Sequence, residues 1–337
     1  MGLTPSQRWA EVDLNAVGHN LGAIAGHLPP GTRIFAVVKA GAYGHGAQPV
    51  ARAALQAGAF GLAVATLDEA QELAGLCPPD RMLVMGAVLP EQMAEAAGTG
   101  FALTVSSRQQ VEALEAAATG PLPLHLKIDT GMGRFGCPPA DAAGLAARIA
   151  HSRHLRLAGV MTHFASAGTD PALTRAQFGL FREVLAGLGA AAGLRHACNS
   201  AAALHHPEMA LDAVRIGIAL YGCEWPGLRP AMAVRAAITH LKTVPNGATV
   251  GYGATWRASQ ATQVATAAIG YADGVFRARS NRGWALVRGR PAPLIGQVSM
   301  DAATLDTSGI PGVQVGDAAT FIGGGLTAEQ VAEWSGT

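Results

Sequence analysis

The sequence has few charged residues, few aromatic residues and no long hydrophobic run. Of its 337 residues, 14% are charged and 5% are aromatic, and the formal net charge is +1. A net charge this close to zero leaves no electrostatic footprint for nucleic acid or for an anionic membrane. No uncharged apolar run approaches the roughly 20 residues of a membrane-spanning helix. We therefore expect neither a nucleic-acid partner nor a membrane partner.

Cysteine is also scarce and shows no pairing pattern. The four cysteines are Cys77, Cys137, Cys198 and Cys223, and no C-x-x-C occurs. The opening MGLTPSQRWAEVDL has no apolar core before its first charges, unlike a secretory signal peptide. These features favour a reducing, cytoplasmic setting. The pair His205–His206 beside Glu208 lacks H-E-x-x-H spacing, so we expect no metal site.

Half of the residues are hydrophobic, and the length suggests about two domains. Between residues 33 and 222, short apolar runs alternate with Ala- and Leu-rich segments that have helical spacing. The expected strands are 33–40, 59–66, 81–87, 101–107, 124–130, 155–165, 194–200 and 213–222. Eight strands with helical crossovers predict a (β/α)8 barrel. A doubly wound open sheet is the alternative that the pattern leaves open.

The pattern changes near residue 233. Segments such as VRAAITHLKTV and TQVATAAIGYAD are rich in Val and Thr, alternate in polarity, and are separated by turn residues, which predicts a mostly β domain. The segment LTAEQVAEW is expected to be helical, because Thr327 and Gln330 have capping-box spacing. We assign 8–232 to the barrel and 233–337 to the β domain, with which residues 1–12 can pack.

Functional groups of a (β/α)8 barrel lie at the C-terminal ends of its strands. Lys39 ends the first expected strand and precedes a Gly/Ala-rich loop that holds Tyr43 and His45. Such a lysine could simply extend its amine to solvent. It could instead be a desolvated amine of lowered pKa, suited to Schiff-base chemistry. The small residues of the loop favour the second interpretation, because they let a ligand approach the backbone.

Two further strand ends suggest anion binding. KIDTGMGRFG contains G-x-G-x-x-G, but it follows the fifth strand and has no acidic residue about 20 positions later, which disfavours a dinucleotide site. A glycine-lined loop that presents Arg134 to an anion fits better. Ser200 and Gly217 lie in the segments that end the seventh and eighth strands, CNSAA and RIGIALYG, and barrels often bind phosphate with the loops after these two strands. The alternatives for these two are a helix N-cap and a turn glycine.

The β domain contains two polar clusters of interest. Tyr252 lies between glycines in GYGATW, where it is either a hairpin residue or an exposed phenol that could act as acid or base. Met300 and Asp301 lie in GQVSMDAATLD, where they serve either packing and a turn or a site.

These motifs, in this order, resemble the alanine racemase family from about residue 8 to the end of the sequence. AVVKAGAYGHG is close to the family's pyridoxal-phosphate motif AVVKANAYGHG, and it is followed by KIDTGMGRFG, THFASA, CNSAA, VRIGIALYG, VGYGATW, GYADG and GQVSMDAATLD. The resemblance implies a (β/α)8 barrel with a C-terminal β domain. It also implies a homodimer that interconverts L- and D-alanine for bacterial wall synthesis, with pyridoxal 5′-phosphate as cofactor.

The resemblance assigns two bases. Lys39 would hold the cofactor as an internal aldimine and then act as one base. Tyr252 of the partner subunit would be the other base, on the opposite face of the substrate. Racemisation requires proton removal on one face and proton return on the other, and two bases of nearly neutral pKa meet that requirement.

The resemblance also assigns the binding residues. The cofactor would be held, chiefly at its phosphate, by Tyr43, Asn199, Ser200, Gly217 and Ile218. Arg215 would bond to the pyridine nitrogen, and Arg134 would lie near the cofactor's phenolic oxygen and the substrate carboxylate. Lys127 would be carbamylated and would orient Arg134. His163 would link Tyr252 to Arg215. Met300 and Asp301 would approach the substrate from the partner subunit.

The sequence departs from the family pattern at several positions. The family's Asn, Ser, Arg and acidic residue are replaced here by Gly41, Gly251, Gln297 and Gly168. Family members usually continue into an Arg-rich strand with a phosphate-contacting Tyr, and that segment would lie beyond position 337. The alternatives are a racemase for serine, basic or a broader range of amino acids, and a non-catalytic pyridoxal-phosphate protein. A D-threonine aldolase-like enzyme would require a metal site.

Overall fold

A computed structural model describes residues 6–337, which divide into two units. One unit spans Leu14–Arg229, and the other combines β1 (Arg8–Val12) with Pro230–Thr337. The barrel unit thus begins at Leu14 rather than at residue 8, because β1 pairs antiparallel with β10 (Met232–Val244) instead of with a barrel strand. The expected packing of residues 1–12 concerns in part residues 1–5, which lie outside the described residues.

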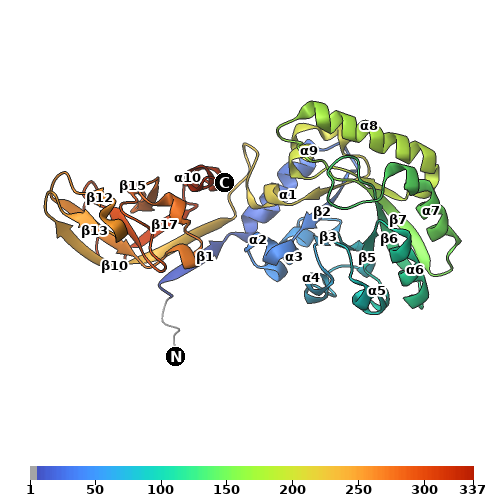
Figure 1. Cartoon of the computed structure of the whole chain (residues 1–337), viewed down its shortest axis with the longest axis horizontal. Helices are drawn as coiled ribbons and strands as arrows, with labels where there is room; N and C mark the ends of the chain where they lie inside the picture. Colours follow the sequence, from blue (N-terminus) through green and yellow to red (C-terminus); the bar gives the residue numbers. More distant parts are fainter. Residues whose placement is uncertain (1–5) are drawn as a thin grey trace. The chain divides into compact units, whose positions relative to one another are not determined.

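The first unit is a closed barrel of eight parallel strands in sequence order (Figure 1). The strands are β2 (Arg33–Val37), β3 (Gly61–Val64), β4 (Met82–Val84), β5 (Ala102–Val105), β6 (Leu122–Lys127), β7 (Leu155–Met161), β8 (Leu194–His196) and β9 (Ala213–Ile216). Closure through the pairing of β2 with β9 confirms the barrel and excludes the open sheet. Most strand residues are buried, and those of β3, β4, β5, β6 and β9 all are, as expected for a parallel sheet covered by helices.

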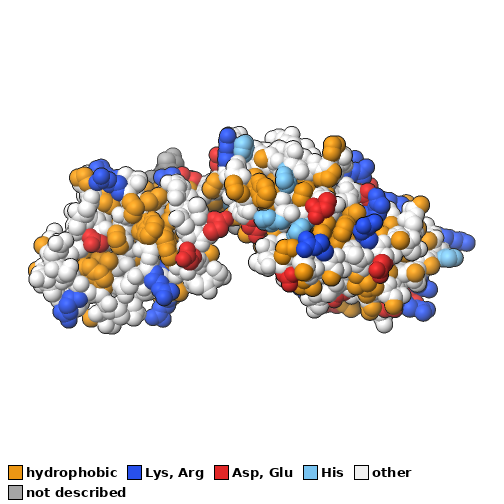
Figure 2. Space-filling model, turned by 90° about the horizontal axis from the view of Figure 1, so that it is seen from above, with side chains coloured by type: hydrophobic (Ala, Val, Ile, Leu, Met, Phe, Trp, Pro, Cys, Tyr) orange, Lys and Arg blue, Asp and Glu red, His pale blue; other side chains and the backbone are white. Residues whose placement is uncertain are grey.

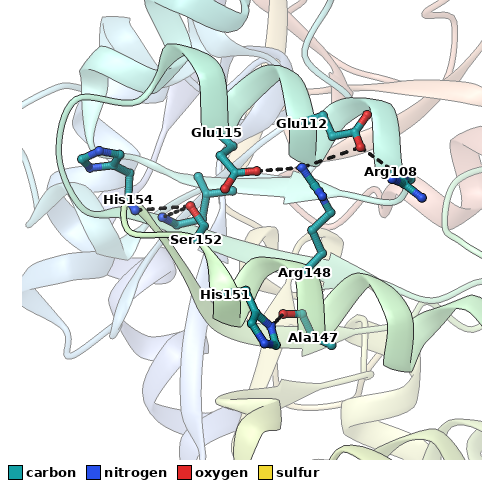
Figure 3. A network of polar contacts seen from close by, with 9 residues as sticks. Arg108, Glu112, Glu115, Ala147, Arg148, His151, Ser152 and His154 are labelled. Carbon is teal, nitrogen blue, oxygen red and sulfur yellow. Dashed lines mark hydrogen bonds and ion pairs between the residues drawn. The ribbon is translucent and has the colours of Figure 1, made fainter.

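Helices surround the barrel (Figure 1). They are α1 (Leu14–His27), α2 (Lys39–Tyr43), α3 (Ala47–Gln56), α4 (Leu67–Glu72), α5 (Met93–Thr99), α6 (Arg108–Ala117), α7 (Ala142–His151), α8 (Pro171–Leu188) and α9 (Ser200–His205). On the outside, Arg148 of α7 pairs with Glu112 and Glu115 of α6 (Figure 3). Such exposed ion pairs contribute at most about 1 kcal/mol each, so burial of the apolar helix faces holds this layer in place.

Side chains fill the inside of the barrel. Phe35, Val37, Ala63, Leu83, Ala102 and Ala213 form a buried apolar cluster there. Because this layer closes the interior, a ligand can enter only from an end of the barrel.

The second unit is built around the 13-residue strand β10. The sheet order is β15–β14–β17–β10–β13–β16, with β1 also pairing with β10. The remaining elements are β11 (Thr249–Val250), β12 (Trp256–Arg257), β13 (Thr262–Ala267), β14 (Trp284–Val287), β15 (Arg290–Pro293), β16 (Ala303–Asp306), β17 (Ala318–Ile322) and α10 (Ala328–Ser335). Thr327 and Gln330 form the expected capping box of α10.

Charged side chains of both signs are interspersed over the face of each unit that Figure 2 shows. No helix within residues 6–337 is long and apolar enough to cross a membrane. Within the same residues, no three His, Cys, Asp or Glu side chains are grouped as metal ligands.

Candidate active site

The C-terminal ends of the barrel strands surround a cavity of about 320 Å³. Its lining includes Lys39, Tyr43, Lys127, Arg134, His163, Asn199, Ser200, Arg215, Gly217 and Ile218. The structure therefore brings together every site residue that the sequence analysis selected within the barrel. The lining holds four Lys or Arg side chains and one carboxylate, that of Glu224. This excess of positive charge favours an anionic ligand.

Lys39 reaches the cavity through an unusual backbone turn. Strand β2 ends at Val37, and the residues from Ala40 to Gly44 all have positive φ. The run is a turn of left-handed helix, which L-residues other than glycine adopt at a cost of roughly 1–2 kcal/mol each. The turn lets Lys39 and Tyr43 line the same cavity, with the Lys39 Nζ 6.0 Å from the centre of the Tyr43 ring.

The Ser200 hydroxyl joins the loops that follow β8 and β9. Its Oγ accepts hydrogen bonds from the backbone N–H groups of Gly217, at 3.0 Å, and Ala219, at 3.3 Å. Ser200 is not the N-cap of α9, since the Asn199 side chain fills that place by accepting from the Ala202 N–H. With both bonds accepted, the Ser200 hydroxyl still has its own proton to donate to a ligand.

The Tyr43 hydroxyl packs closely against Gly217, whose N–H donates to Ser200. A Cβ on Gly217 would lie 2.5 Å from the Tyr43 Oη. The glycine thus lets the Tyr43 hydroxyl lie beside the backbone at the base of the Ser200 loop. The two hydroxyls form a polar corner of the cavity that suits a phosphate group.

Arg215 is buried and uses its terminal nitrogens within the protein. Its Nη1 donates to the Nδ1 of His196 at 2.7 Å, and its Nη2 donates to the Nδ1 of His163 at 3.1 Å. Backbone carbonyls of Thr162, His196 and Ala197 accept from the same two nitrogens. The Nε–H of Arg215 is bonded to none of these groups, so this donor is left for a ligand in the cavity.

The histidines beside Arg215 are neutral. Burial, then the charge of Arg215, lowers the pKa of His163 to about 2 and holds that of His196 well below its usual value. Neutral His196 accepts from Arg215 at Nδ1, so its Nε2 carries the proton that it donates to the Nδ1 of His125, 2.8 Å away. Burial lowers the pKa of Arg215 to about 10, and the guanidinium stays protonated at neutral pH.

Lys127 is a buried lysine at the end of β6. Burial, then the charges of Arg215 and Arg134, lowers its pKa to about 8. The ring of Phe135 contacts both side chains, with its centre 5.2 Å from the Lys127 Nζ and 5.7 Å from the Arg134 Cζ. A lysine of this pKa is partly neutral near physiological pH, which suits carbamylation.

Three selected residues lie in the other unit. Tyr252 begins η7 (Tyr252–Ala254) and is 72% exposed. It lines a shallow concavity together with Met300 and Asp301. The structure thus brings these three residues together, but in a different unit from Lys39.

The two units match two successive family models. Residues 12–224 match the model described as "Alanine racemase, N-terminal domain", and residues 231–337 match "Alanine racemase, C-terminal domain". The chain belongs to the alanine racemase family.

Individual relatives agree with this assignment. The alanine racemase of Desulforamulus reducens is 43% identical over 98% of this chain and 94% of its own length. The crystal structure of alanine racemase from Streptomyces lavendulae has a TM-score of 0.92 at 37% identity, over 99% of this chain and 93% of that one. The alanine racemase from Bartonella henselae, solved with covalently bound pyridoxal phosphate, has a TM-score of 0.89 at 27% identity, over 99% and 95%.

The cavity of this alanine racemase family member fits pyridoxal phosphate. The cofactor needs an amine for its aldehyde, donors for its phosphate and a partner for its pyridine nitrogen. Lys39, the Tyr43–Ser200 corner and the Nε–H of Arg215 provide these groups around one cavity. No cavity-lining carboxylate other than Glu224 opposes the phosphate charge.

Sequence reasoning missed the residues behind Arg215 in this alanine racemase family member. His125 lies within β6, where its apolar neighbours make it resemble an ordinary core residue, and His196 is the last residue of the short strand β8. Thr162 follows β7, and its carbonyl accepts from Arg215 at 2.7 Å. A polar side chain inside an otherwise apolar barrel strand was the available signal, since a buried polar group needs a partner.

Proposed function

We propose that this protein is an alanine racemase that interconverts L- and D-alanine with pyridoxal 5′-phosphate. The observation that carries the proposal is the single cavity in which Lys39, the Tyr43–Ser200 corner and the Nε–H of Arg215 converge. Family membership supplies the substrate. In a bacterial cell, D-alanine would serve peptidoglycan synthesis, and the lack of a C-x-x-C pattern among the four cysteines suits the cytoplasm.

The bound cofactor would acidify the α-proton of alanine by withdrawing electrons. Lys39, which directly precedes the left-handed turn, would hold the cofactor and exchange a proton with the α-carbon on one face. Tyr252 of the partner subunit would exchange a proton on the other face, so that the active site is shared within a homodimer. Its exposure in the β unit leaves the hydroxyl accessible for that role.

Arg215 would direct its Nε–H at the pyridine nitrogen. A guanidinium does not transfer its proton there, so a bound ring would stay uncharged and would withdraw electrons less strongly than a protonated ring. Neutral His163 and His196 hold the guanidinium in place by accepting its other protons. Restricted electron withdrawal favours return of the proton to the substrate over transfer to the cofactor.

Arg134 would bind the substrate carboxylate, with Lys127 as its neighbour. The neutral amine of Lys127 can add CO2 at Nζ, with release of a proton, to give an anionic carbamate. That change would replace a buried cation beside Arg134 and Arg215 with a negative charge that both attract. Met300 and Asp301 of the partner subunit would close the site around the substrate.

The test is racemisation of L-alanine in heavy water with added pyridoxal phosphate. Loss of optical rotation together with exchange of the α-hydrogen is expected. Lys39→Ala should abolish both, whereas Tyr252→Phe should leave exchange on one face and slow the loss of rotation. Parallel assays with L-serine and L-lysine distinguish an alanine racemase from a racemase that acts on other amino acids. Absence of racemisation in all three, with cofactor bound, would sink the proposal.

A further inference from the structure

The Glu69 carboxylate joins the ends of two barrel strands. Its Oε1 accepts the backbone N–H of Ala40 at 2.7 Å. Its Oε2 accepts the N–H of Ala65 at 2.7 Å and that of Thr66 at 3.3 Å. Glu69 lies in the first turn of α4, where the helix dipole also favours a negative charge. Only part of this bonding belongs to the helix, since Ala40 is 29 residues away along the chain.

Ala40 is the entry to the left-handed turn that carries Lys39. It has φ 52°, Ala42 has 55° and Tyr43 has 54°, so three residues with side chains adopt the disfavoured region within four positions. Such strain persists only where the surroundings hold it. The far end of the turn is held by its own backbone, through the bond from the Gly46 N–H to the Gly41 carbonyl at 2.8 Å.

The near end relies on a side chain from another element. The first N–H of the turn, that of Ala40, goes to Glu69. A hydrogen bond to a carboxylate is roughly twice as strong as one between neutral groups. It thus acts at the peptide that directly follows the lysine, where a backbone rotation would redirect the Lys39 side chain.

We propose that Glu69 is a positioning residue for Lys39. Its carboxylate holds the left-handed turn in place, so that the Lys39 amine and the Tyr43 hydroxyl face the same cavity. The inference rests on the proposed function only in that Lys39 forms the covalent link to the cofactor.

The carboxylate is needed because both of its oxygens accept. In Glu69→Gln one oxygen becomes an amide NH2, which would face an N–H donor either at Ala40 or at Ala65. The substitution keeps the size and shape of the side chain but removes the hydrogen bonds that one of its two oxygens accepts. Glu72→Gln is the matched control, since Glu72 is an exposed carboxylate of the same helix.

Thr66→Ala separates positioning from helix capping. The Thr66 Oγ accepts the Glu69 N–H at 3.2 Å, which is the other half of the same capping box. Its removal weakens the start of α4 but leaves the Glu69–Ala40 bond. A role of Glu69 in capping alone would make Thr66→Ala and Glu69→Gln behave alike.

The experiment follows the covalent Lys39–cofactor link in the full-length holoprotein. Its visible absorbance band would be recorded against pH and during dialysis, and borohydride reduction with peptide mapping would identify the linked lysine. In Glu69→Gln we expect the band to disappear about tenfold faster on dialysis and to titrate at a shifted pH. Thr66→Ala and Glu72→Gln should keep wild-type dialysis rates, although Thr66→Ala lowers the Tm.

A double variant protects the test against simple misfolding. Glycine populates positive φ without steric cost. Ala40→Gly combined with Glu69→Gln should therefore recover part of the wild-type dialysis rate, with far-UV circular dichroism as the check on folding. No recovery, or equal effects of Glu69→Gln and Thr66→Ala, would overturn the inference. Failure of the wild-type protein to link the cofactor at all would instead overturn the proposed function.

Discussion

At the scale of single residues, Lys127 is the clearest case of chemistry set by surroundings. Its amine is buried beside Arg215 and Arg134, and Asp129 opposes them only in part. The ammonium form is therefore disfavoured in the folded protein, whereas the unfolded chain restores its ordinary pKa. The stability of the protein must consequently depend on pH through this residue.

We expect the free energy of unfolding to rise with pH between about 8 and 10.5 because of Lys127. The pKa of Lys127 is lower in the folded protein than in the unfolded chain, so the unfolded chain binds more protons in this window. Raising the pH removes the free energy that this extra proton gives to the unfolded state, and the folded state becomes relatively more stable. Below pH 8, Lys127→Met should be more stable than wild type in carbonate-free buffer, and the Tm difference should shrink by several degrees by pH 10.5. A Tm difference that is constant across this range would contradict the assignment.

Labelled bicarbonate provides the companion measurement. Wild-type protein given [13C]bicarbonate should show a carbamate resonance that Lys127→Met lacks. Exposed lysines keep a mostly protonated amine near neutral pH and react little with CO2, so they should contribute little to this resonance.

At the scale of elements, the loop that presents Arg134 depends on close backbone contact. The Asp129 carboxylate accepts the N–H groups of Gly131, Met132 and Gly133. Partial burial alone would raise the pKa of Asp129, but these N–H groups lower it below its usual value. At the end of the loop, a Cβ on Gly136 would lie 2.5 Å from the Asp129 nitrogen.

Two glycines of this loop allow a matched comparison. Gly133→Ala places a Cβ at φ +69° with no atom within 4 Å, so it should cost only about 1–2 kcal/mol. Gly136→Ala at φ +128° must also separate two backbone segments, and we expect a loss above about 3 kcal/mol. Because Arg134 would move with the loop, Gly136→Ala should also raise KM for alanine more than Gly133→Ala does. Denaturant unfolding and steady-state kinetics measure the two effects, and equal results for the two variants would argue against this account.

At the scale of the whole molecule, the proposed bases lie in different units. Lys39 belongs to Leu14–Arg229, and Tyr252 belongs to the unit formed by β1 and Pro230–Thr337. The proposal that one subunit supplies Lys39 and its partner supplies Tyr252 is a statement about assembly, and it can be tested without a structure of the dimer.

Complementation between inactive variants is that test. Lys39→Ala and Tyr252→Phe should each have little activity. After the two are mixed and allowed to exchange subunits, half of the dimers are hybrids, and each hybrid has one intact site if the site is shared. Activity should then approach about a quarter of wild type. Mixed protein that stays as inactive as its components, with hybrids demonstrated by mass, would refute a shared site.

Much of the fold could be predicted from the sequence, because runs of apolar residues and helix-capping spacings are local patterns that indicate strands and helix starts directly. The eight apolar runs correspond to β2–β9, and the Thr327–Gln330 spacing marks the start of α10. The ends were predicted less well. The apolar run at 33–40 continues past β2, whose last residue is Val37, because the positive φ values that follow leave no trace in hydrophobic periodicity.

The sequence predicted which side chains line the cavity, but it did not predict the residues that hold them in place. Lys39, Ser200 and Arg215 lie at or near strand ends and Arg134 lies in the loop after β6, and the topology of a barrel gathers these positions around one cavity. The supporting residues could not be predicted, because Glu69 meets Ala40, and His196 meets Arg215, only through segments that are distant in sequence. Ser200 illustrates the difference, since the sequence left a helix cap open as the alternative for it, and in the fold Asn199 takes that place.

The sequence by itself determined the barrel, the β domain and the kinds of side chain at the strand ends, because periodicity, turns and motif order are local properties. Only the tertiary structure decided which donors are already used and which remain for a ligand. The Nε–H of Arg215 is left over because neutral histidines and carbonyls from separate strands take the other protons. Lys127 acquires its lowered pKa for the same reason, since burial and neighbouring charges exist only after the chain has folded.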